Sequence, residues 1–216
     1  METPQRAEPI VVVGGGGHAK AVIAILRKLP RYHILGYTDQ QDKGKVLGVP
    51  CLGSDRELTA LASSSQHLHA VLAVGQVGLG DRRRDLWQRL HTPGLSFPFL
   101  VSPDAVLNEE VAGGEGAVVM DGAVINSGAT LGRFAIINTH STVEHDVALA
   151  DWVHVAPGAT ISGGATVGQF SMIGAGATVI EGIKIAPGCM VGAGAVVVRD
   201  LTEPGVYVGS PARRIK

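Results

Sequence analysis

One pattern dominates the second half of this 216-residue chain: an aliphatic residue stands at every sixth position without interruption. The run goes from Val119 to Val197, and all fourteen positions hold Val, Ile or Leu. In a chain with 45% hydrophobic residues, chance would produce such a run with a probability on the order of one in 100,000 or less. A fixed short period of this kind predicts a solenoid of repeated units.

A second set of positions at the same six-residue period, which we call the small-residue column, follows each aliphatic residue by four and mostly holds small residues. Ala123, Ala129 and Ala135 begin it, and larger residues such as Val147 and Val153 interrupt it. We interpret each hexad as a short strand and a turn, with the aliphatic side chain inside a narrow prism and the small residue at the turn where coils stack. Three hexads would form one triangular coil. Because so short a strand cannot bury itself, stacked coils must supply the core. A β-sandwich fits poorly, because its alternation has period two.

The first hundred residues follow a different pattern, in which apolar runs alternate with segments of helical spacing. The segments that we expect are strands at 10–13, 33–38 and 69–74, a glycine turn at 14–17, and helices at 18–29 and about 81–91. Such an alternation predicts a small parallel α/β sheet. The chain therefore divides into an α/β domain at 1–100 and a β-helical domain at 101–216.

Composition and charge exclude several classes of partner. The formal net charge is −1 and the densest basic cluster is Arg82–Arg84, so neither nucleic acid nor an anionic membrane is expected as a partner. The two cysteines have no metal-type spacing. The apolar run Ile10–Val13 is too short for a signal core or a membrane span, which predicts a cytoplasmic protein. A small-molecule partner is the better expectation.

Five motifs in order give the chain its resemblance to a known family. They are VVVGGGGHAK, IINTHSTVEHDVALADWVHVAPGATISGG, MIGAGATVI, MVGAGAVVV and GVYVGSPARRI. The chain resembles the hexapeptide-repeat acyltransferases, and among them the sugar acetyltransferases of the sialic-acid O-acetyltransferase and bacillosamine N-acetyltransferase type, a group that includes GDP-perosamine N-acetyltransferase. The resemblance implies a Rossmann-like α/β domain followed by a left-handed parallel β-helix, a homotrimer, acetyl-CoA as co-substrate, and no metal.

Acetyl transfer to an amine or hydroxyl needs a base and hydrogen-bond donors for the oxyanion. His145 is the candidate base, because it occupies the third position of the hexad led by Val143, where a side chain should point outward. The resemblance implies that Asp146 holds its imidazole in the useful tautomer. Glu144 is the alternative orienting residue, and the pattern leaves that choice open.

For the acetyl donor, the resemblance implies a contact from His154 to the acetyl group or thioester and a backbone amide at Gly163. A groove between neighbouring β-helices would hold the pantetheine arm of CoA, and the C-terminal tail would close over the adenine end. The residues expected to bind acetyl-CoA are His154, Gly163, Gly174, Ala175, Ala193 and Arg213.

For the acceptor, the tetraglycine turn offers backbone N–H groups and a helix N-terminus to a phosphate. Asp39 would contact the base or ribose, whereas Gln40 stands where relatives often carry a second acid and leaves the nucleobase open. Asn138 matches a position that faces the sugar. The residues expected to bind the nucleotide sugar are Gly14, Gly16, Gly17, His18, Asp39, Gln40 and Asn138.

These features predict an acetyl-CoA-dependent N-acetyltransferase for a nucleotide-linked 4-amino-4,6-dideoxy sugar, with GDP-perosamine favoured over a UDP-linked sugar. O-acetylation of a sugar is the first alternative, and a non-catalytic β-helical assembly protein is the second. A metal-dependent enzyme is disfavoured, because His140, His145, Asp146 and His154 lie close in sequence but match no zinc spacing.

Overall fold

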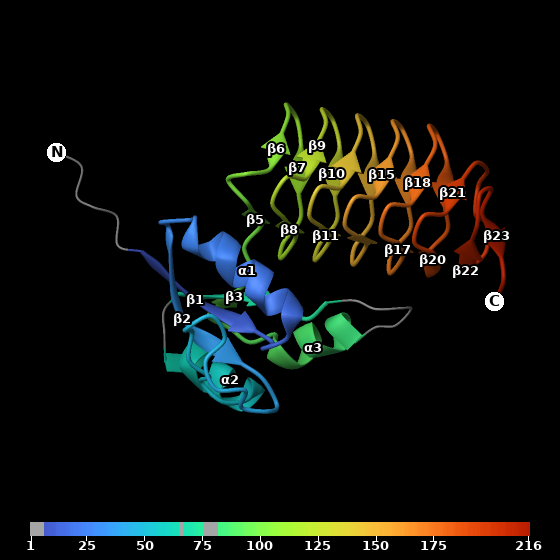
Figure 1. The fold of residues 1–216 in the computed structure, drawn as a ribbon. Helices are drawn as coiled ribbons and strands as arrows, with labels where there is room; N and C mark the ends of the chain where they lie inside the picture. The colour runs from blue at the N-terminus through green and yellow to red at the C-terminus, as the bar shows by residue number, and fades with distance from the viewer. Residues whose placement is uncertain (1–6, 65–66, 76–81) are drawn as a thin grey trace. The chain divides into compact units, whose positions relative to one another are not determined.

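The computed structural model describes residues 7–64, 67–75 and 82–216, which divide into two compact units (Figure 1). Of the described residues, 7–75 and 82–98 form the first unit, and 99–216 belong to the second. The predicted fold class, a small α/β domain followed by a hexapeptide-repeat β-helix, is confirmed.

The first unit is a four-stranded parallel sheet with three helices. Its strand order is β2-β1-β3-β4, and residues Ile10 to Val13 of β1 are at most 1% exposed because this strand has a partner on either side. The elements are β1 (Glu8–Val13), α1 (Gly17–Arg27), β2 (Tyr32–Thr38), α2 (Asp55–Ser64), β3 (Leu68–Leu72), α3 (Arg82–Leu90) and β4 (Leu95–Ser96).

The sequence pattern found three of these strands and two of the helices, and it missed α2 and β4. A capping box marks the start of α2: the backbone N–H and hydroxyl of Ser54 both donate to the Glu57 carboxylate at 2.6 Å. That Ser-x-x-Glu signal stands in the sequence and was the cue to this helix. The predicted start of the third helix, Asp81, lies outside the described residues.

The second unit is a parallel β-helix whose strands form three sheets, coloured green to red in Figure 1. The five-stranded sheet contains β7 (Ala112–Gly113), β10 (Thr130–Leu131), β13 (Ala148–Leu149), β16 (Thr166–Val167) and β19 (Lys184–Ile185). The six-stranded sheet contains β6 (Val106–Leu107), β9 (Val124–Ile125), β12 (Thr142–Val143), β15 (Thr160–Ile161), β18 (Thr178–Val179) and β21 (Val196–Val197). The eight-stranded sheet contains β5 (Leu100–Val101), β8 (Val118–Val119), β11 (Ile136–Ile137), β14 (His154–Val155), β17 (Met172–Ile173), β20 (Cys189–Val191), β22 (Gly205–Val208) and β23 (Arg213–Arg214).

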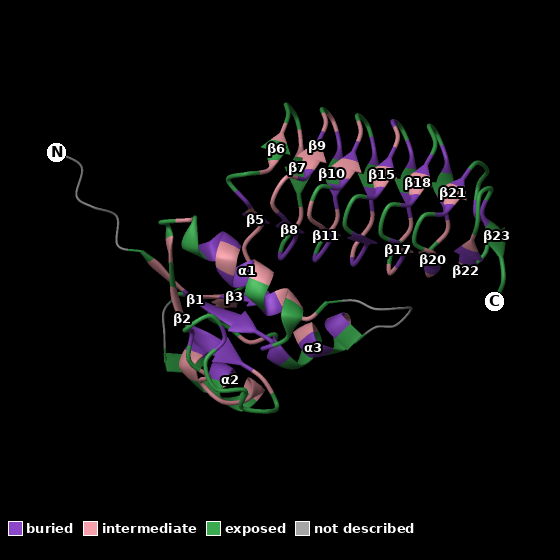
Figure 2. Cartoon of the chain, viewed as in Figure 1, coloured by how far each residue is buried: buried purple, intermediate pink, exposed green. Residues whose placement is uncertain are grey.

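The register of these sheets confirms the coil of three hexads. Val143 pairs with Ile125 on one side and Ile161 on the other, 18 residues away in each direction. The aliphatic column and the small-residue column are both buried, as the purple positions of Figure 2 show, and they form one continuous core. At the C-terminal end β23 departs from the pattern and pairs antiparallel with β22.

A third column, which the sequence reading did not find, lies at the corners of the prism. From residue 110 to residue 194 every sixth residue has a positive φ. Glycine occupies most of these positions, since it adopts this conformation without steric cost. Six corners carry a side chain instead: Glu110, Phe134, His140, Asp146, Trp152 and Phe170.

Three of these side chains form an aromatic stack along one corner. The rings of Phe134 and Trp152 lie 4.3 Å apart between centroids at 6°, and those of Trp152 and Phe170 lie 6.4 Å apart at 7°. Phe134 and Trp152 are buried. Stacking and burial of these rings offset the backbone cost of non-glycine residues at a positive φ.

Candidate functional site

His145 and Asp146 form the turn between β12 and β13, at one corner of the β-helix. The Nδ1 atom of His145 lies 2.9 Å from Oδ2 of Asp146, and both side chains are exposed, which confirms that His145 points outward. The hydrogen bond that the imidazole N–H donates to the Asp146 carboxylate raises the pKa of His145, and the charges of Asp146, Glu144 and Glu181 raise it further. The structure therefore brings an imidazole and its orienting carboxylate together, with Nε2 facing away from the carboxylate.

The imidazole of His145 extends over Gly163, the residue that stands one coil further along at the same corner. A Cβ at Gly163 would lie 2.5 Å from Nε2 of His145, so only glycine leaves room for the ring. The N–H groups of Ser162 and Gly164 tie this corner to neighbouring coils. Among the described residues the N–H of Gly163 has no such role, so it remains available as a donor near Nε2.

Glu144 belongs to a ladder of side chains on successive coils that sequence reasoning missed. Asn126 donates to Oε2 of Glu144 at 2.7 Å, and Asn108 donates to Oδ1 of Asn126 at 2.5 Å. Because the ladder fixes the Glu144 carboxylate, Asp146 is the residue that binds the imidazole. The spacing of 18 residues was the available signal, once three hexads are taken as one coil.

Asn138 and His154 form a second cluster, on the eight-stranded sheet. Nδ2 of Asn138 lies 3.1 Å from Nε2 of His154, and His154 is only 6% exposed. His145 and His154 are nine residues apart, which is half of the 18-residue coil. Within one chain the predicted constellation is thus split between two sides of the prism.

The residues expected to line a CoA groove differ in whether their backbone groups are free to bind a ligand. The N–H and C=O of Gly174 are both used within the β-helix, by Val191 and Ala177. The N–H groups of Ala175 and Ala193 are not engaged in this way among the described residues.

Two arginines stand at the C-terminal end of the β-helix. Arg213 is exposed on β23 and bonds the carbonyl of its own neighbour, Ala212, at 3.0 Å. Nη1 of Arg214 forms an ion pair with Glu203 at 2.6 Å. Arg213 therefore keeps more of its guanidinium free for a phosphate than Arg214 does.

In the first unit the four glycines of the turn divide into two pairs. Gly14 and Gly15 are packed: a Cβ at Gly14 would lie 2.9 Å from Val74, and the N–H of Gly15 donates to Asp39 at 2.8 Å. Gly16 and Gly17 are exposed with open space around them, at the N-terminus of α1, where no side chain caps the helix. These two positions are where an anion can meet free N–H groups.

His18 follows the turn and is largely buried. Burial and, to a lesser extent, the charge of Arg83 together lower the pKa of His18 to about 4. Its Nε2 atom is buried and has no hydrogen-bond partner in the part of the chain that the structure describes. His18 is thus neutral near pH 7, and it offers a hydrogen-bonding ring atom instead of a positive charge.

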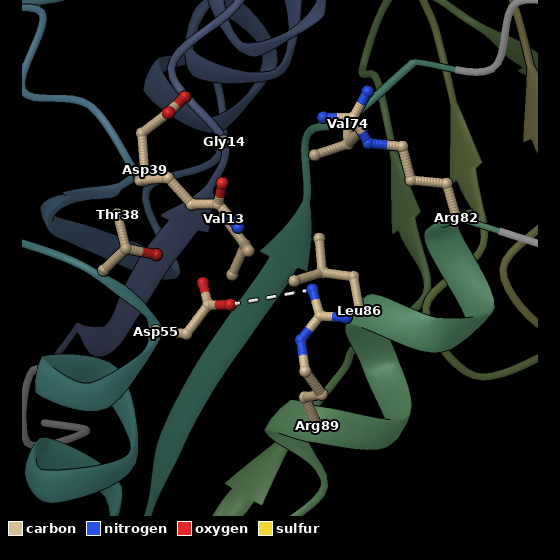
Figure 3. A pocket seen from close by; sticks show the side chains of 10 residues that line it. Val13, Gly14, Thr38, Asp39, Asp55, Val74, Arg82, Leu86 and Arg89 are labelled. Atoms are coloured by element: carbon tan, nitrogen blue, oxygen red, sulfur yellow. Dashed lines mark ion pairs between the residues drawn. The ribbon is translucent and has the colours of Figure 1, made fainter.

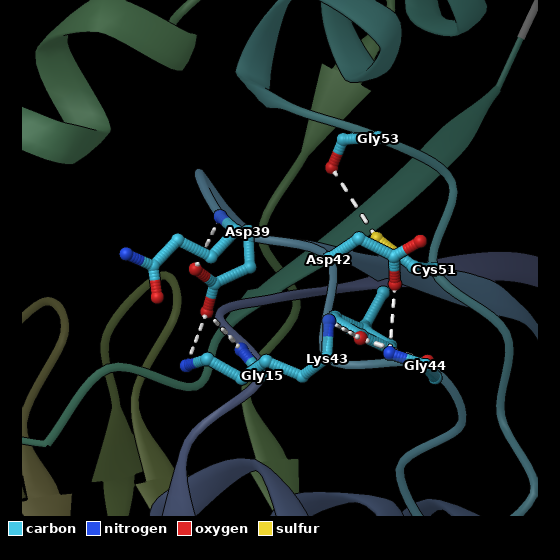
Figure 4. Close-up of polar contacts among 9 residues, drawn as sticks. Gly15, Asp39, Asp42, Lys43, Gly44, Cys51 and Gly53 are labelled. Carbon is cyan, nitrogen blue, oxygen red and sulfur yellow. Dashed lines mark hydrogen bonds and ion pairs between the residues drawn. The ribbon is translucent and has the colours of Figure 1, made fainter.

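Asp39 holds the turn and the loop after β2 together (Figure 4). Its Oδ2 atom accepts from the N–H of Gly15 and, at 3.0 Å, from Nζ of Lys43, while Oδ1 accepts from the N–H of Gln41. Burial alone would raise the pKa of Asp39, but these three hydrogen bonds and the charge of Lys43 lower it below its usual value. Asp39 is therefore ionised, with part of its bonding capacity already used by the protein.

A pocket opens at the carboxyl ends of β1, β2 and β3, next to α2 and α3 (Figure 3). Asp55 and Arg89 point toward each other in it, 3.9 Å apart. Thr38 is fully buried, and its hydroxyl has no hydrogen-bond partner among the described residues. The lining residues are Val13, Gly14, Thr38, Asp39, Gln40, Asp55, Val74, Arg82, Leu86 and Arg89.

Sequence reasoning identified Gly14, Asp39 and Gln40 in this pocket and missed the residues from the two helices. Asp55 lies on α2, which was not predicted. Arg89 lies on α3, which was predicted as a helix but without any binding residue. Ligands of open α/β sheets bind outside the carboxyl ends of the strands. The position of the pocket therefore makes it a candidate ligand site.

Two other kinds of feature have no candidate among the described residues. Within residues 7–64, 67–75 and 82–216, no group of three or more His, Cys, Asp or Glu side chains is arranged to hold a metal ion. None of the described helices has the length and apolar character needed to cross a membrane.

The β-helix of hexapeptide repeats places the chain in the class of the hexapeptide transferases, and one of its corners carries the His145–Asp146 pair. Residues 9–85 match the family model of the PglD N-terminal domain, and residues 164–199 match that of the bacterial transferase hexapeptide (six repeats). The chain belongs to the family of hexapeptide-repeat sugar acetyltransferases, as its similarity to solved structures over nearly its whole length shows.

Three solved structures illustrate that similarity. The acetyltransferase domain of PglB from Neisseria gonorrhoeae FA1090, in complex with acetyl coenzyme A, is 33% identical with a TM-score of 0.89, covering 97% of this chain and 100% of that one. PerB from Caulobacter crescentus, in complex with CoA and GDP-perosamine, is 37% identical with a TM-score of 0.88, covering 96% and 97%. WeeI from Acinetobacter baumannii AYE is 26% identical with a TM-score of 0.85, covering 97% and 100%. The predicted family and the predicted enzyme class, an acetyltransferase, are confirmed.

Proposed function

We propose that this enzyme transfers an acetyl group from acetyl-CoA to the amine of a nucleotide-linked 4-amino-4,6-dideoxy sugar, with GDP-perosamine as the favoured acceptor. The observation that carries the proposal is the His145–Asp146 pair, whose ring lies against Gly163. The donor and the acceptor are supported by relatives crystallised with acetyl coenzyme A and with CoA and GDP-perosamine.

In the proposed mechanism, the acceptor ammonium first releases one proton to water. The neutral amine then forms a C–N bond to the thioester carbonyl, and Nε2 of His145 takes the second proton. The N–H of Gly163 donates to the oxyanion of the tetrahedral intermediate. The C–S bond breaks, its electron pair leaves on the CoA sulfur, and the imidazolium returns the proton to that thiolate.

The acceptor would bind through the first unit. The exposed N–H groups of Gly16 and Gly17 suit the pyrophosphate, and the pocket beside them suits the base. Guanine offers two N–H donors on one edge and the acceptors O6 and N7 on another. Asp55 and Arg89 complement these two edges, which favours GDP over UDP.

The split between His145 and the Asn138–His154 pair supports assembly as a homotrimer. A neighbouring copy could supply His154 and Asn138 to the corner that carries His145. The same groove would hold CoA against Ala175 and Ala193, with Arg213 near a phosphate.

The test is a direct assay with acetyl-CoA. We expect release of CoA thiol and a product one acetyl group heavier with GDP-perosamine, a slower reaction with a UDP-linked 4-amino sugar, and none with GDP-mannose, which offers hydroxyls only. Acetylation of GDP-mannose at a comparable rate would favour O-acetylation. No transfer to any acceptor, together with no binding of acetyl-CoA, would favour a non-catalytic assembly protein.

A further inference from the structure

The ring of His145 has two different sides. Nδ1 is bound to Asp146 within its own turn. Nε2 extends over Gly163, which places it at the level of the next coil. An acceptor that loses a proton to Nε2 must therefore approach from the side of the coils that follow His145.

Glu181 is the next residue in this corner column. The N–H of Gly164 donates to the C=O of His145, and the N–H of Gly182 donates to the C=O of Gly163, both at 2.9 Å, so the three turns are stacked in register. Neighbouring strands lie about 4.8 Å apart, and Glu181 is exposed. Because Gly163 has no side chain, it places none between the imidazole of His145 and the turn that carries Glu181.

The other two carboxylates near the imidazole, those of Asp146 and Glu144, do not lie on the Nε2 side of the ring. Asp146 binds Nδ1, and Glu144 is bonded to Asn126 on the preceding coil. Arg199 follows Glu181 by 18 residues in the sequence. Besides the hydrogen bond to Asp146, the charges of Asp146, Glu144 and Glu181 all raise the pKa of His145, which agrees with a carboxylate of Glu181 near the ring.

We propose that Glu181 is a specificity-determining residue, which holds the ammonium form of an amine acceptor beside Nε2 of His145. This inference rests on the proposed function and deepens it. The amine of an amino sugar is largely protonated near neutral pH, and a hydroxyl carries no charge. A carboxylate on the approach side therefore raises the local concentration of amine acceptors and leaves hydroxyl acceptors unaffected.

The chain offers a matched control in Glu109. It stands 36 residues before His145 in the same corner column, as Glu181 stands 36 residues after it, and both are exposed. Glu109→Gln thus removes an identical charge at the same number of coils, on the side from which the ring points away.

The kinetic test compares the full-length wild type, Glu181→Gln and Glu109→Gln with acetyl-CoA and GDP-perosamine at pH 7, in low and in high salt. We expect Glu181→Gln to raise the KM for GDP-perosamine about fivefold at low salt, the effect of one charge pair in a water-like dielectric. Its kcat should stay within about twofold, and the difference should shrink as salt screens the charge. Glu109→Gln should match the wild type. An unchanged KM in Glu181→Gln, or equal effects of the two variants, overturns the proposal.

A second measurement keeps this result separate from the proposed function. The pKa of His145 in the free enzyme can be followed through its Cε1–H resonance by NMR, without any acceptor. We expect Glu181→Gln to lower this pKa and Glu109→Gln to leave it unchanged. If the wild type acetylates no amino sugar, the proposed function fails. The titration still tests whether the Glu181 carboxylate lies near the imidazole. Equal pKa values of His145 in Glu181→Gln and Glu109→Gln would overturn that placement.

Discussion

The imidazole of His145 occupies the space that a side chain at Gly163 would need. A Cβ at residue 163 would lie 2.5 Å from Nε2 and 2.6 Å from Cε1 of that ring. The two residues are 18 apart and stand on successive coils at one corner, so the orientation of the imidazole depends on a glycine that is remote in sequence.

Gly163→Ala should therefore inactivate the enzyme without unfolding it. The new methyl group must displace the imidazole, which removes the base from the acceptor and is expected to lower kcat by about 100-fold or more. The backbone of Gly163 has no positive φ, so the melting temperature should change little.

The control for this variant is the double mutant Gly163→Ala/His145→Ala. If the alanine acts only by moving the ring, it has no further effect once the ring is gone. A double mutant much slower than His145→Ala alone would show that the added methyl group also disturbs the reaction by a route other than displacing the imidazole.

Asp146→Asn tests how the base is tuned. The carboxylate raises the pKa of His145, and the base acts in its neutral form, so the rate falls as pH drops through that pKa. Removing the charge lowers the pKa, and the acidic limb of the kcat profile should move to lower pH. The plateau should fall about tenfold or more, because the tautomer is no longer held.

Asparagine suits this comparison because it tolerates the positive φ of 58° at Asp146. The circular dichroism spectrum and the mass of the assembly in solution should thus stay those of the wild type. A limb that moves to higher pH would mean that another group titrates in the profile.

How far the sequence could predict this molecule differs between its parts. The six-residue column of aliphatic side chains determines the coil, because each position must be buried for the prism to close. Val143 and its equivalents are accordingly in the core. His145 could be assigned to the exterior because it stands two residues after Val143, at the third position of that hexad.

Contacts between coils could not be predicted in the same way. The ladder from Asn108 through Asn126 to Glu144, and the fit of His145 against Gly163, join residues 18 apart, and they become visible only when coils are stacked in register. The split of His145 from His154 also follows from coil geometry. Both histidines lie in one motif, yet half a coil separates them.

Trp152 offers a test of the aromatic corner. Trp152→Ala removes the ring that stacks on both Phe134 and Phe170, and it should cost about 3–5 kcal/mol in the free energy of unfolding. Trp152 has a φ of 65°, and glycine adopts this conformation without strain. We therefore expect Trp152→Gly to be about 1 kcal/mol more stable than Trp152→Ala, the reverse of the usual order.

Chemical denaturation of the two variants and the wild type measures both differences. Trp87→Ala and Trp87→Gly supply the matched pair, since Trp87 lies within α3 and should show the usual preference for alanine. If Trp152→Ala is the more stable of its pair, the corner does not impose the left-handed backbone in solution.

Asp55→Asn tests whether the Asp55 carboxylate recognises the nucleobase. A carboxylate can accept two hydrogen bonds from the N–H edge of guanine, whereas an amide presents a donor in place of one acceptor. Loss of a charge-assisted hydrogen bond is worth about 1.5–3 kcal/mol, so the affinity for GDP should fall about tenfold or more. Binding of UDP should change less than twofold.

Asp85→Asn is the control, since Asp85 lies on the adjacent helix, is not among the lining residues of the pocket and pairs with Arg84 at 3.2 Å. Calorimetry measures the affinities of the wild type, Asp55→Asn and Asp85→Asn for GDP and UDP. If Asp55→Asn loses affinity for both nucleotides equally, Asp55 maintains the shape of the pocket and does not contact the base.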